Sequence, residues 1–378
     1  MYHVKTMNKI SKIGLAELDD RFAISDTMEH EDAILVRSAK LHDYDFPAEL
    51  KCIARAGAGV NNIPLDRAAD AGIVVFNAPG ANANGVKELT IAALLLASRK
   101  ISQGITWVKE QSAAGADVAA VVEKGKSAYV GPEIMGKTLG VVGLGAIGVL
   151  VANAAAALGM KIVGYDPFLS VTHALNLTPG VEVVDTLPEL YAKADYISLH
   201  LPMNDATRGT LNEAAFAAMK DGVRIVNLAR GELVDTPALK AALDSGKCAA
   251  YVTDFPNSET AAIEGVVAIP HLGASTPESE DNCAMMAARD VKDYLDNGSI
   301  INSVNLPNLT MAWAAKTRVC VISKGADAAA IAGAVPAVAS ASNTRGEYAY
   351  TILDTDAAVD EAAIAAIPGV LRVRVLTR

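Results

Sequence analysis

The chain reads Gly143-Leu144-Gly145-Ala146-Ile147-Gly148 between an apolar run, residues 139–142, and a stretch of helix-forming residues, 149–158. Gly143 permits a tight turn from strand to helix, Gly145 lets a pyrophosphate approach the backbone, and Gly148 lets the helix pack close to the sheet. The phosphates of a dinucleotide would then face unpaired N–H groups at the positive end of the helix. The spacing predicts a dinucleotide-binding loop; the alternative is a tight glycine turn in an ordinary α/β sheet.

A second apolar stretch, residues 161–165, follows that helix and ends at Asp166. A carboxylate at the tip of this strand can accept hydrogen bonds from both hydroxyls of the adenosine ribose, and it would repel a 2′-phosphate. The sequence therefore favours NAD over NADP. Residues 138–160 carry no charge and are long enough to suggest a membrane span. Five glycines interrupt them, however, and a strand, loop and helix account for the same residues.

Composition limits the class of protein. At 378 residues the chain is too long for one ordinary domain, and its 51% of hydrophobic residues are enough for large cores. Only 5% are aromatic, and aliphatic packing suits parallel sheets covered by helices. The net charge of −10 argues against a nucleic-acid partner. The four cysteines are scattered, so we expect no disulfide, no metal site and a reducing cytoplasm, and the start of the chain shows no signal peptide.

Apolar runs that alternate with helical patterns predict an α/β protein with two doubly wound parallel-sheet domains and a small α+β tail. In the first domain we expect strands at 12–15, 33–36, 51–54 and 73–76, and we expect residues 112–130 to be irregular. We predict a flavodoxin-like substrate domain, a Rossmann NAD domain and a regulatory tail, with the bounds 1–98 plus 287–305, 99–286, and 317–378.

Three polar residues fall at or just after predicted strand ends in the second half of the chain: Arg230, Glu259 and His271. The carboxyl ends of parallel strands share one edge of a sheet, where ligands bind. An imidazole suits removal of a hydroxyl proton, a carboxylate on its other nitrogen fixes its tautomer, and a guanidinium can grip a substrate carboxylate. Each also has a structural alternative: a hydrogen-bonded histidine, a surface ion pair and a solvated carboxylate. Asp254 could be a turn residue or meet the nicotinamide.

The stretch Asn227-Leu228-Ala229-Arg230-Gly231-Glu232-Leu233-Val234-Asp235 resembles a signature of the D-isomer-specific 2-hydroxyacid dehydrogenases. Residues 143–148, 164–167 and His200-Leu201-Pro202 resemble the same family. Residues 55–62, 77–79 and 270–276 are similar to the branch that oxidises 3-phosphoglycerate.

This resemblance implies Arg230, Glu259 and His271 as the catalytic residues, with His271 as the acid/base. It implies an NAD site formed by Gly143, Gly145, Ala146, Ile147, Gly148, Asp166, Leu201, Pro202, Leu228, Ala229, Asp254, His271, Gly273 and Ala274. It also implies a substrate site formed by Arg55, the backbone of Ala56, Gly57, Ala58, Gly59 and Val60, and Arg230. We add Arg37 for the substrate phosphate, since it follows a predicted strand; surface ion pairs remain the alternative for Arg37 and Arg55.

The tail, at residues 344–354 and 368–374, resembles an ACT regulatory module. We cannot place its second strand, and Lys324-Gly325-Ala326-Asp327 stands where that module usually has an Asn-x-Pro-Gly turn, so we expect a truncated module. An open sheet edge would then be free to pair with another subunit.

The resemblance implies a cytoplasmic, NAD-dependent oxidation of 3-phospho-D-glycerate to 3-phosphooxypyruvate, the first step of serine biosynthesis, in a homodimer or homotetramer without nucleic-acid or membrane partners. The alternatives are another member of the family, such as a glyoxylate/hydroxypyruvate reductase or a D-lactate dehydrogenase, and a non-catalytic NAD-sensing relative.

Overall fold

The computed structural model describes all 378 residues, which form two compact units. Unit 1 consists of Met1–Asn82 and Pro277–Arg378, and unit 2 is Ala83–Thr276. These bounds differ from the predicted ones at two helices, and the tail, predicted as a separate domain, falls within unit 1. Helix α3 (Ala83–Ser98) packs on α6 (Ala146–Ala157) and on two strands of unit 2, and α11 (Pro277–Asn297) packs on unit 1 along its length. Each long helix therefore lies wholly within one unit.

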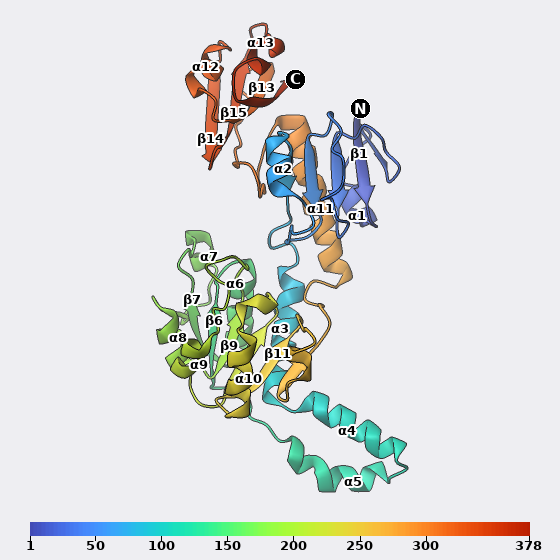
Figure 1. Ribbon diagram of the computed structural model, residues 1–378, viewed down its shortest axis with the longest axis vertical. Helices are drawn as coiled ribbons and strands as arrows, with labels where there is room; N and C mark the ends of the chain where they lie inside the picture. The colour runs from blue at the N-terminus through green and yellow to red at the C-terminus, as the bar shows by residue number, and fades with distance from the viewer. The chain divides into compact units, whose positions relative to one another are not determined.

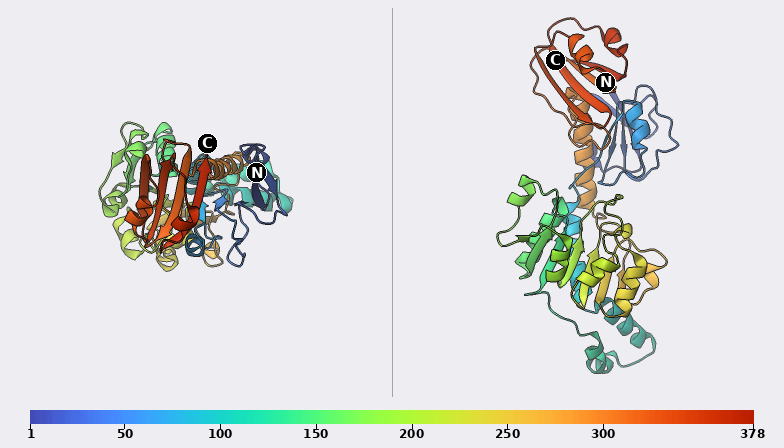
Figure 2. Two further views of the ribbon diagram at one scale, coloured as in Figure 1. Left: turned by 90° about the horizontal axis from the view of Figure 1, so that it is seen from above. Right: turned by 60° about the vertical axis from the view of Figure 1, so that its left-hand side comes forward.

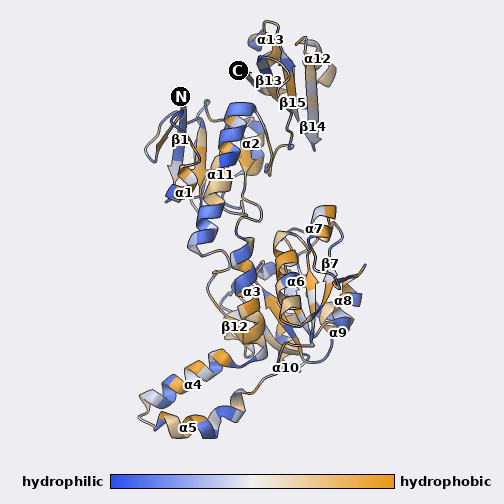
Figure 3. Cartoon of the chain, turned by 180° about the vertical axis from the view of Figure 1, so that it is seen from behind, coloured by the Kyte–Doolittle hydropathy of each residue, from blue (hydrophilic) through white to orange (hydrophobic).

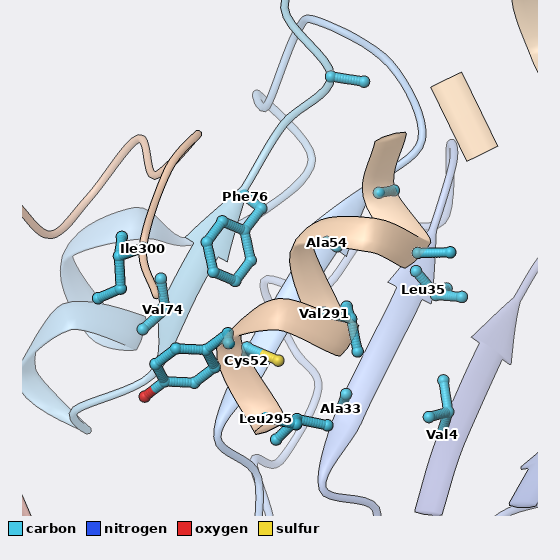
Figure 4. Close-up of a cluster of buried hydrophobic side chains, with 14 of the residues drawn as sticks. Val4, Ala33, Leu35, Cys52, Ala54, Val74, Phe76, Val291, Leu295 and Ile300 are labelled. Carbon is cyan, nitrogen blue, oxygen red and sulfur yellow. The ribbon is translucent and has the colours of Figure 1, made fainter. Parts of the chain in front are cut away.

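Unit 1 contains a five-stranded parallel sheet in the order β2-β1-β3-β4-β5, which is the flavodoxin-like order. Its strands are β1 (Tyr2–Met7), β2 (Phe22–Ser25), β3 (Ala33–Val36), β4 (Cys52–Arg55) and β5 (Val74–Phe76), and its short helices are α1 (Lys12–Leu15) and α2 (Leu65–Asp70). Figure 4 shows α11 lying over the strands, with Leu295 beside Ala33, and Val291, Cys52 and Phe76 belong to the same buried cluster. Every β3 residue is buried because the sheet is covered on both faces.

Residues 12–15, predicted as a strand, form helix α1 instead. The Ser11 hydroxyl accepts a hydrogen bond from the Ile13 N–H and caps the helix. A Cβ at Gly14 would lie 2.4 Å from the Ala284 side chain, so α1 packs closely on α11. Strand β1, which lies between β2 and β3 in the sheet, was not predicted from the sequence.

Unit 2 is a seven-stranded parallel sheet in the order β12-β11-β10-β9-β6-β7-β8 with helices on both faces (Figure 1). Helices α3 and α6 enclose one buried cluster, and α8 to α10 enclose the other. The strands are β6 (Thr138–Val142), β7 (Lys161–Tyr165), β8 (Glu182–Val183), β9 (Tyr196–Leu199), β10 (Val223–Asn227), β11 (Cys248–Thr253) and β12 (Val266–Ala268). The remaining helices are α7 (Val171–Leu175), α8 (Leu187–Lys193), α9 (Glu213–Ala218) and α10 (Thr236–Asp244), with short 3₁₀ turns η2 (Gly231–Leu233) and η3 (Thr260–Ala262).

Residues 138–160, the candidate span, are strand β6, the glycine loop and helix α6. No helix of the protein combines the length and the apolar character that crossing a membrane requires.

Residues 112–130, predicted to be irregular, belong largely to a helical hairpin that projects from unit 2 (Figure 1). The hairpin consists of α4 (Ile101–Ala113), α5 (Val118–Gly125) and the 3₁₀ turn η1 (Lys126–Tyr129). Asp117 caps α5 by accepting a hydrogen bond from the Ala120 N–H, a signal that the alanine-rich composition concealed. Neither α4 nor α5 contains a buried residue, and apolar and polar residues are mixed along both (Figure 3).

The tail is a complete βαββαβ module, so the prediction of a truncated module was wrong. Its four antiparallel strands lie side by side in the order β14-β15-β13-β16 (Figure 2). The elements are β13 (Thr317–Lys324), α12 (Ala328–Gly333), β14 (Ala339–Arg345), β15 (Tyr348–Thr355), α13 (Glu361–Ala365) and β16 (Val370–Thr377). The missing strand is β14, whose small polar residues are mostly exposed and lack an apolar alternation.

Candidate active site

The glycine loop of unit 2 has the geometry that a dinucleotide requires. Gly143 adopts a φ of +94°, and a Cβ there would lie 2.6 Å from the His200 carbonyl oxygen. A Cβ at Gly148 would lie 1.9 Å from the Gly143 carbonyl oxygen, so the helix can pack here only on glycine. No heavy atom lies within 4 Å of a Cβ placed on Gly145, which leaves open space beside the loop.

Helix α6 begins at Ala146, and no side chain caps its first turn, so the N–H groups of Ala146 and Ile147 are available to an anion. The Asp166 carboxylate accepts hydrogen bonds from the N–H groups of Leu144, at 2.8 Å, and Phe168, at 2.9 Å. These bonds hold the carboxylate beside the glycine loop. The Leu201 side chain borders the same turn, 3.2 Å from the position of a Cβ on Gly143.

Asp254 is the most unusual polar residue of the site. It is 1% exposed and follows β11, and its Oδ2 accepts a hydrogen bond from the Gly273 N–H at 3.0 Å. Its Oδ1 is buried and has no hydrogen-bond partner. Burial raises the pKa of this carboxyl above its usual range, against the opposing hydrogen bond from Gly273.

An orphaned buried acceptor is rare and requires an explanation. A carboxamide N–H donor, such as the nicotinamide of NAD carries, would satisfy Asp254 Oδ1. The open space at Gly145, the free helix end at Ala146 and the fixed carboxylate of Asp166 fit the remainder of that cofactor. The residues present therefore fit NAD.

The structure brings Arg230 and His271 close to one aromatic ring. Arg230 follows β10, and its Cζ lies 5.3 Å from the centre of the Phe255 ring. His271 follows β12, and the centroid of its imidazole lies 4.3 Å from the centroid of the Phe255 ring. The prediction from the sequence did not include Phe255, because an apolar residue type gives no chemical signal.

Glu259 is not paired with His271 in this structure. It lies at the start of η3, its carboxylate is exposed, and it forms no hydrogen bond to the imidazole. Its backbone N–H donates to the Asn257 side chain. Leu228 is buried after β10, Ala229 donates its N–H to Asn227 Oδ1, and Ala274 and Pro202 lie in the loops that follow Gly273 and Leu201.

The predicted substrate residues other than Arg230 lie in unit 1, at the carboxyl ends of β3 and β4. There a pocket of about 660 Å³ is lined by Arg37, Ser38, Lys40, His42, Arg55, Asn61 and Asn62. The Arg37 guanidinium forms an ion pair of 2.6 Å with Glu280, and the Arg55 Nε donates to the Arg37 carbonyl oxygen at 3.0 Å. Lys40 and His42 were not predicted, although their position directly after Arg37 could have indicated them.

The loop between Arg55 and the following helix is held in place by hydrogen bonds. Ala56 donates its N–H to Val36, Gly57 accepts from Ala78, and Ala58 accepts from the Asn77 side chain. A Cβ at Gly57, with φ +152°, would lie 1.9 Å from Arg55 Nη1, so glycine allows the guanidinium to lie against the backbone. The Ala58, Gly59 and Val60 N–H groups have no backbone acceptor and can serve an anion.

Part of the chain matches a known protein family. Residues 91–273 match the family model of the D-isomer specific 2-hydroxyacid dehydrogenase, NAD binding domain. This match lies within unit 2, and together with the dinucleotide loop and the parallel sheet it shows that residues 91–273 form an NAD-binding domain similar to those of the D-isomer-specific 2-hydroxyacid dehydrogenases.

The chain is similar to D-3-phosphoglycerate dehydrogenases over most of its length. It is 35% identical over 315 residues to the one from Methanocaldococcus jannaschii, a match that covers 81% of this chain and 58% of the relative. It is 40% identical over 299 residues to the one from Mycobacterium bovis, covering 76% of this chain and 53% of the relative. The chain thus spans little more than half the length of these relatives.

A solved structure shares the fold. The NAD⁺-bound 3-phosphoglycerate dehydrogenase of Entamoeba histolytica superimposes with a TM-score of 0.62 and 26% identity, and the match covers 82% of this chain and 99% of that one.

Proposed function

We propose that this protein oxidises 3-phospho-D-glycerate to 3-phosphooxypyruvate with NAD⁺, the first step of serine biosynthesis. The observation that carries the proposal is the cationic pocket of unit 1. The chain has a net charge of −10, yet Arg37, Lys40, His42 and Arg55 line a single pocket of about 660 Å³. Such a pocket supports a substrate with two anionic groups more than it supports lactate or glyoxylate.

We assign the substrate carboxylate to Arg230 and to the Arg55 loop, and the phosphate to Arg37 and Lys40. The Arg37–Glu280 ion pair is about 40% exposed on both sides, so it contributes little and can give way to a phosphate. Guanidinium groups bind carboxylate and phosphate oxygens in a two-point manner, which supports both assignments.

The proposed chemistry assigns the proton to His271. Its imidazole takes the proton of the C2 hydroxyl, and the Arg230 guanidinium stabilises the negative charge that develops on the C2 oxygen. Bound NAD⁺ supplies the acceptor for the C2 hydride. Glu259 would orient the imidazole once its exposed side chain reaches the second ring nitrogen. General-base catalysis of this kind typically accelerates a reaction by about 10²–10⁴-fold.

Assembly and location complete the proposal. We propose a homodimer or homotetramer, which the unburied apolar residues of the α4–α5 hairpin support. A cytoplasmic location is supported by four buried cysteines, all of them unpaired. The βαββαβ order supports an ACT-type regulatory role for the tail, with an effector different from the one that an Asn-x-Pro-Gly turn would serve.

The test follows NADH absorbance with the full chain, NAD⁺ and a panel of 3-phosphoglycerate, D-glycerate and D-lactate. We expect kcat/KM for 3-phosphoglycerate to exceed the other values by at least about 100-fold, because two charge-assisted contacts to the phosphate are worth several kcal/mol. Equal values would overturn the assignment of a phosphate-bearing substrate, and the broader proposal of a 2-hydroxyacid dehydrogenase would stand.

A matched pair of variants locates the phosphate. Lys40→Ala should raise KM for 3-phosphoglycerate by about 10-fold and leave that for D-glycerate unchanged. Lys316→Ala, which removes an exposed lysine outside the pocket, should change neither value. An unchanged KM in Lys40→Ala would remove this lysine from the phosphate site.

A further inference from the structure

Phe255 is close to both of the side chains to which the proposed reaction assigns its chemistry. Its ring centroid is 4.3 Å from that of His271, at an interplanar angle of 46°, and 5.3 Å from the Arg230 Cζ. The three residues come from the ends of three neighbouring strands, β10, β11 and β12. No role was assigned to this ring from the sequence.

The backbone around Phe255 is fixed. Its N–H donates to the Thr253 hydroxyl at 3.0 Å, and the preceding Asp254 is tied to Gly273. A Cβ placed on Gly231 would lie 3.4 Å from the Phe255 carbonyl oxygen, so the backbone that follows Arg230 lies next to the backbone of Phe255. The backbone that carries the ring is therefore held in place, and the segments that contain Arg230 and His271 can both pack against the ring.

The imidazole of His271, by contrast, has little else to hold it. Neither of its ring nitrogens forms a hydrogen bond, and the residue is exposed. The Arg230 guanidinium has one fixed contact, a hydrogen bond of 2.6 Å from Nη1 to the Ala229 carbonyl oxygen. The contact with Phe255 is thus the one packing interaction that the two side chains have in common.

We propose that Phe255 is a positioning residue that sets the imidazole of His271 and the guanidinium of Arg230 at a fixed separation. This inference rests on the proposed function. The face of an aromatic ring is electron-rich, so it attracts the guanidinium and also the imidazole once that has taken a proton. The ring lets both cationic groups serve one substrate without a hydrogen bond between them, and small misplacements of such groups are costly in rate.

A purely structural role for Phe255 makes a different prediction. If the ring only fills space, leucine would serve nearly as well as tyrosine, because both preserve apolar volume. If the flat, electron-rich face is what matters, tyrosine would replace phenylalanine and leucine would not.

The experiment compares Phe255→Leu, Phe255→Tyr and a matched control, Phe216→Leu, which alters a buried phenylalanine of α9 in the same unit. In the full chain with NAD⁺ and 3-phosphoglycerate, we expect Phe255→Leu to lower kcat by about 10- to 100-fold and Phe255→Tyr to stay within about threefold of the original protein. The dissociation constant for NAD⁺ should stay within about twofold in all three variants. Phe216→Leu should keep kcat.

A spectroscopic signature reports on the ring contact independently of turnover. The imidazole protons of His271, assigned by their loss in His271→Asn, should show an aromatic ring-current shift that disappears in Phe255→Leu and persists in Phe255→Tyr. If Phe255→Leu keeps full kcat, or if Phe255→Tyr is as impaired as Phe255→Leu, the positioning role is wrong. If the original protein oxidises no 2-hydroxy acid, the proposed function fails, and the resonance shift still decides whether the ring orients the imidazole.

Discussion

Three aspartates show how the surroundings of one side-chain type decide its task. Asp166 lies at a strand tip, with its carboxylate held by two N–H groups beside the glycine loop. Asp254 is buried with one oxygen unpaired, which suits a donor from a ligand. Asp290, on α11, is buried and accepts from Asn302 Nδ2 at 3.0 and 3.1 Å, and burial raises its pKa to about 6. We therefore propose the first two for the cofactor site and assign the third to the stability of unit 1.

Asp290 makes stability depend on pH. Its folded pKa of about 6 lies above the ordinary value of 3.8, so the folded state binds this proton more tightly than the unfolded chain. The stabilisation is complete below about pH 4 and is lost as pH rises through 6, with a span of about 2–3 kcal/mol. About half of this span falls between pH 5 and pH 8, so Asp290→Asn should gain about 1–1.5 kcal/mol of stability relative to the original protein over that interval. Urea unfolding at the two pH values checks this, and an equal difference at both would contradict it.

Much of the residue-level site was predictable from the sequence, because its chemistry depends on residue type and spacing. Gly143, Gly148 and Asp166 have one plausible use each once a strand and a helix surround them. Phe255 was not predictable, because its role depends on a distance across neighbouring strands. The pairing of Glu259 with His271 stays a prediction, since their side chains do not meet here.

At the scale of elements, the C-terminal end of α11 is closed by the tail. Arg374 is buried and donates to the carbonyl oxygens of Tyr294, at 3.0 Å, and Leu295, at 2.9 Å. Arg318, paired with Asp354 at 2.7 Å, donates to Asn297, and the Tyr350 hydroxyl donates to Gly298 at 2.6 Å. These bonds satisfy carbonyls that every helix leaves open at this end, and they place positive charge where the helix dipole favours it. The tail sheet and α11 are consequently one structural element.

Removing this cap should destabilise unit 1. Arg374→Met preserves the length of the side chain but leaves the Tyr294 and Leu295 carbonyls without donors, at a cost of about 2–4 kcal/mol. Arg378→Met removes a terminal exposed arginine and serves as the control. The midpoint of urea unfolding should fall in the first variant only; equal midpoints would show that the cap contributes nothing.

Element prediction failed where the local pattern and the tertiary environment disagree. Residues 12–15 have the composition of a buried strand, but the Ser11 cap and the close packing on Ala284 make them helical. Strand β14 has almost no apolar residue, and it forms because the β15 backbone pairs with it along its length. In the first case the packing partner, Ala284, is distant in the sequence, and in the second case the partner is the next strand of a hairpin.

At the scale of the whole molecule, the hairpin of α4 and α5 is the feature without a partner. Its apolar residues Ile101, Ile105, Trp107, Val108 and Tyr129 line an open groove of about 470 Å³. Helices of 13 and 8 residues with no buried side chain are marginal by themselves, so contact with a second chain would account for their formation.

If the hairpin joins subunits, charges on its apolar face should separate them. Ile105→Glu combined with Val108→Glu should reduce the mass measured by light scattering from that of a dimer or tetramer to that of the monomer. Ile13→Glu is a matched control, since Ile13 in unit 1 is 55% exposed and Ile105 is 53% exposed. An unchanged mass in the double variant would assign the subunit contact to another surface.

The central claim is that the imidazole of His271 moves the proton while NAD⁺ binds at the glycine loop. His271→Asn tests it most directly, because asparagine removes the proton acceptor and preserves a polar side chain. With 3-phosphoglycerate we expect kcat to fall by about 10²–10⁴-fold, with the NAD⁺ dissociation constant within about twofold of its original value. A variant that turns over within about tenfold of the original protein would contradict the account.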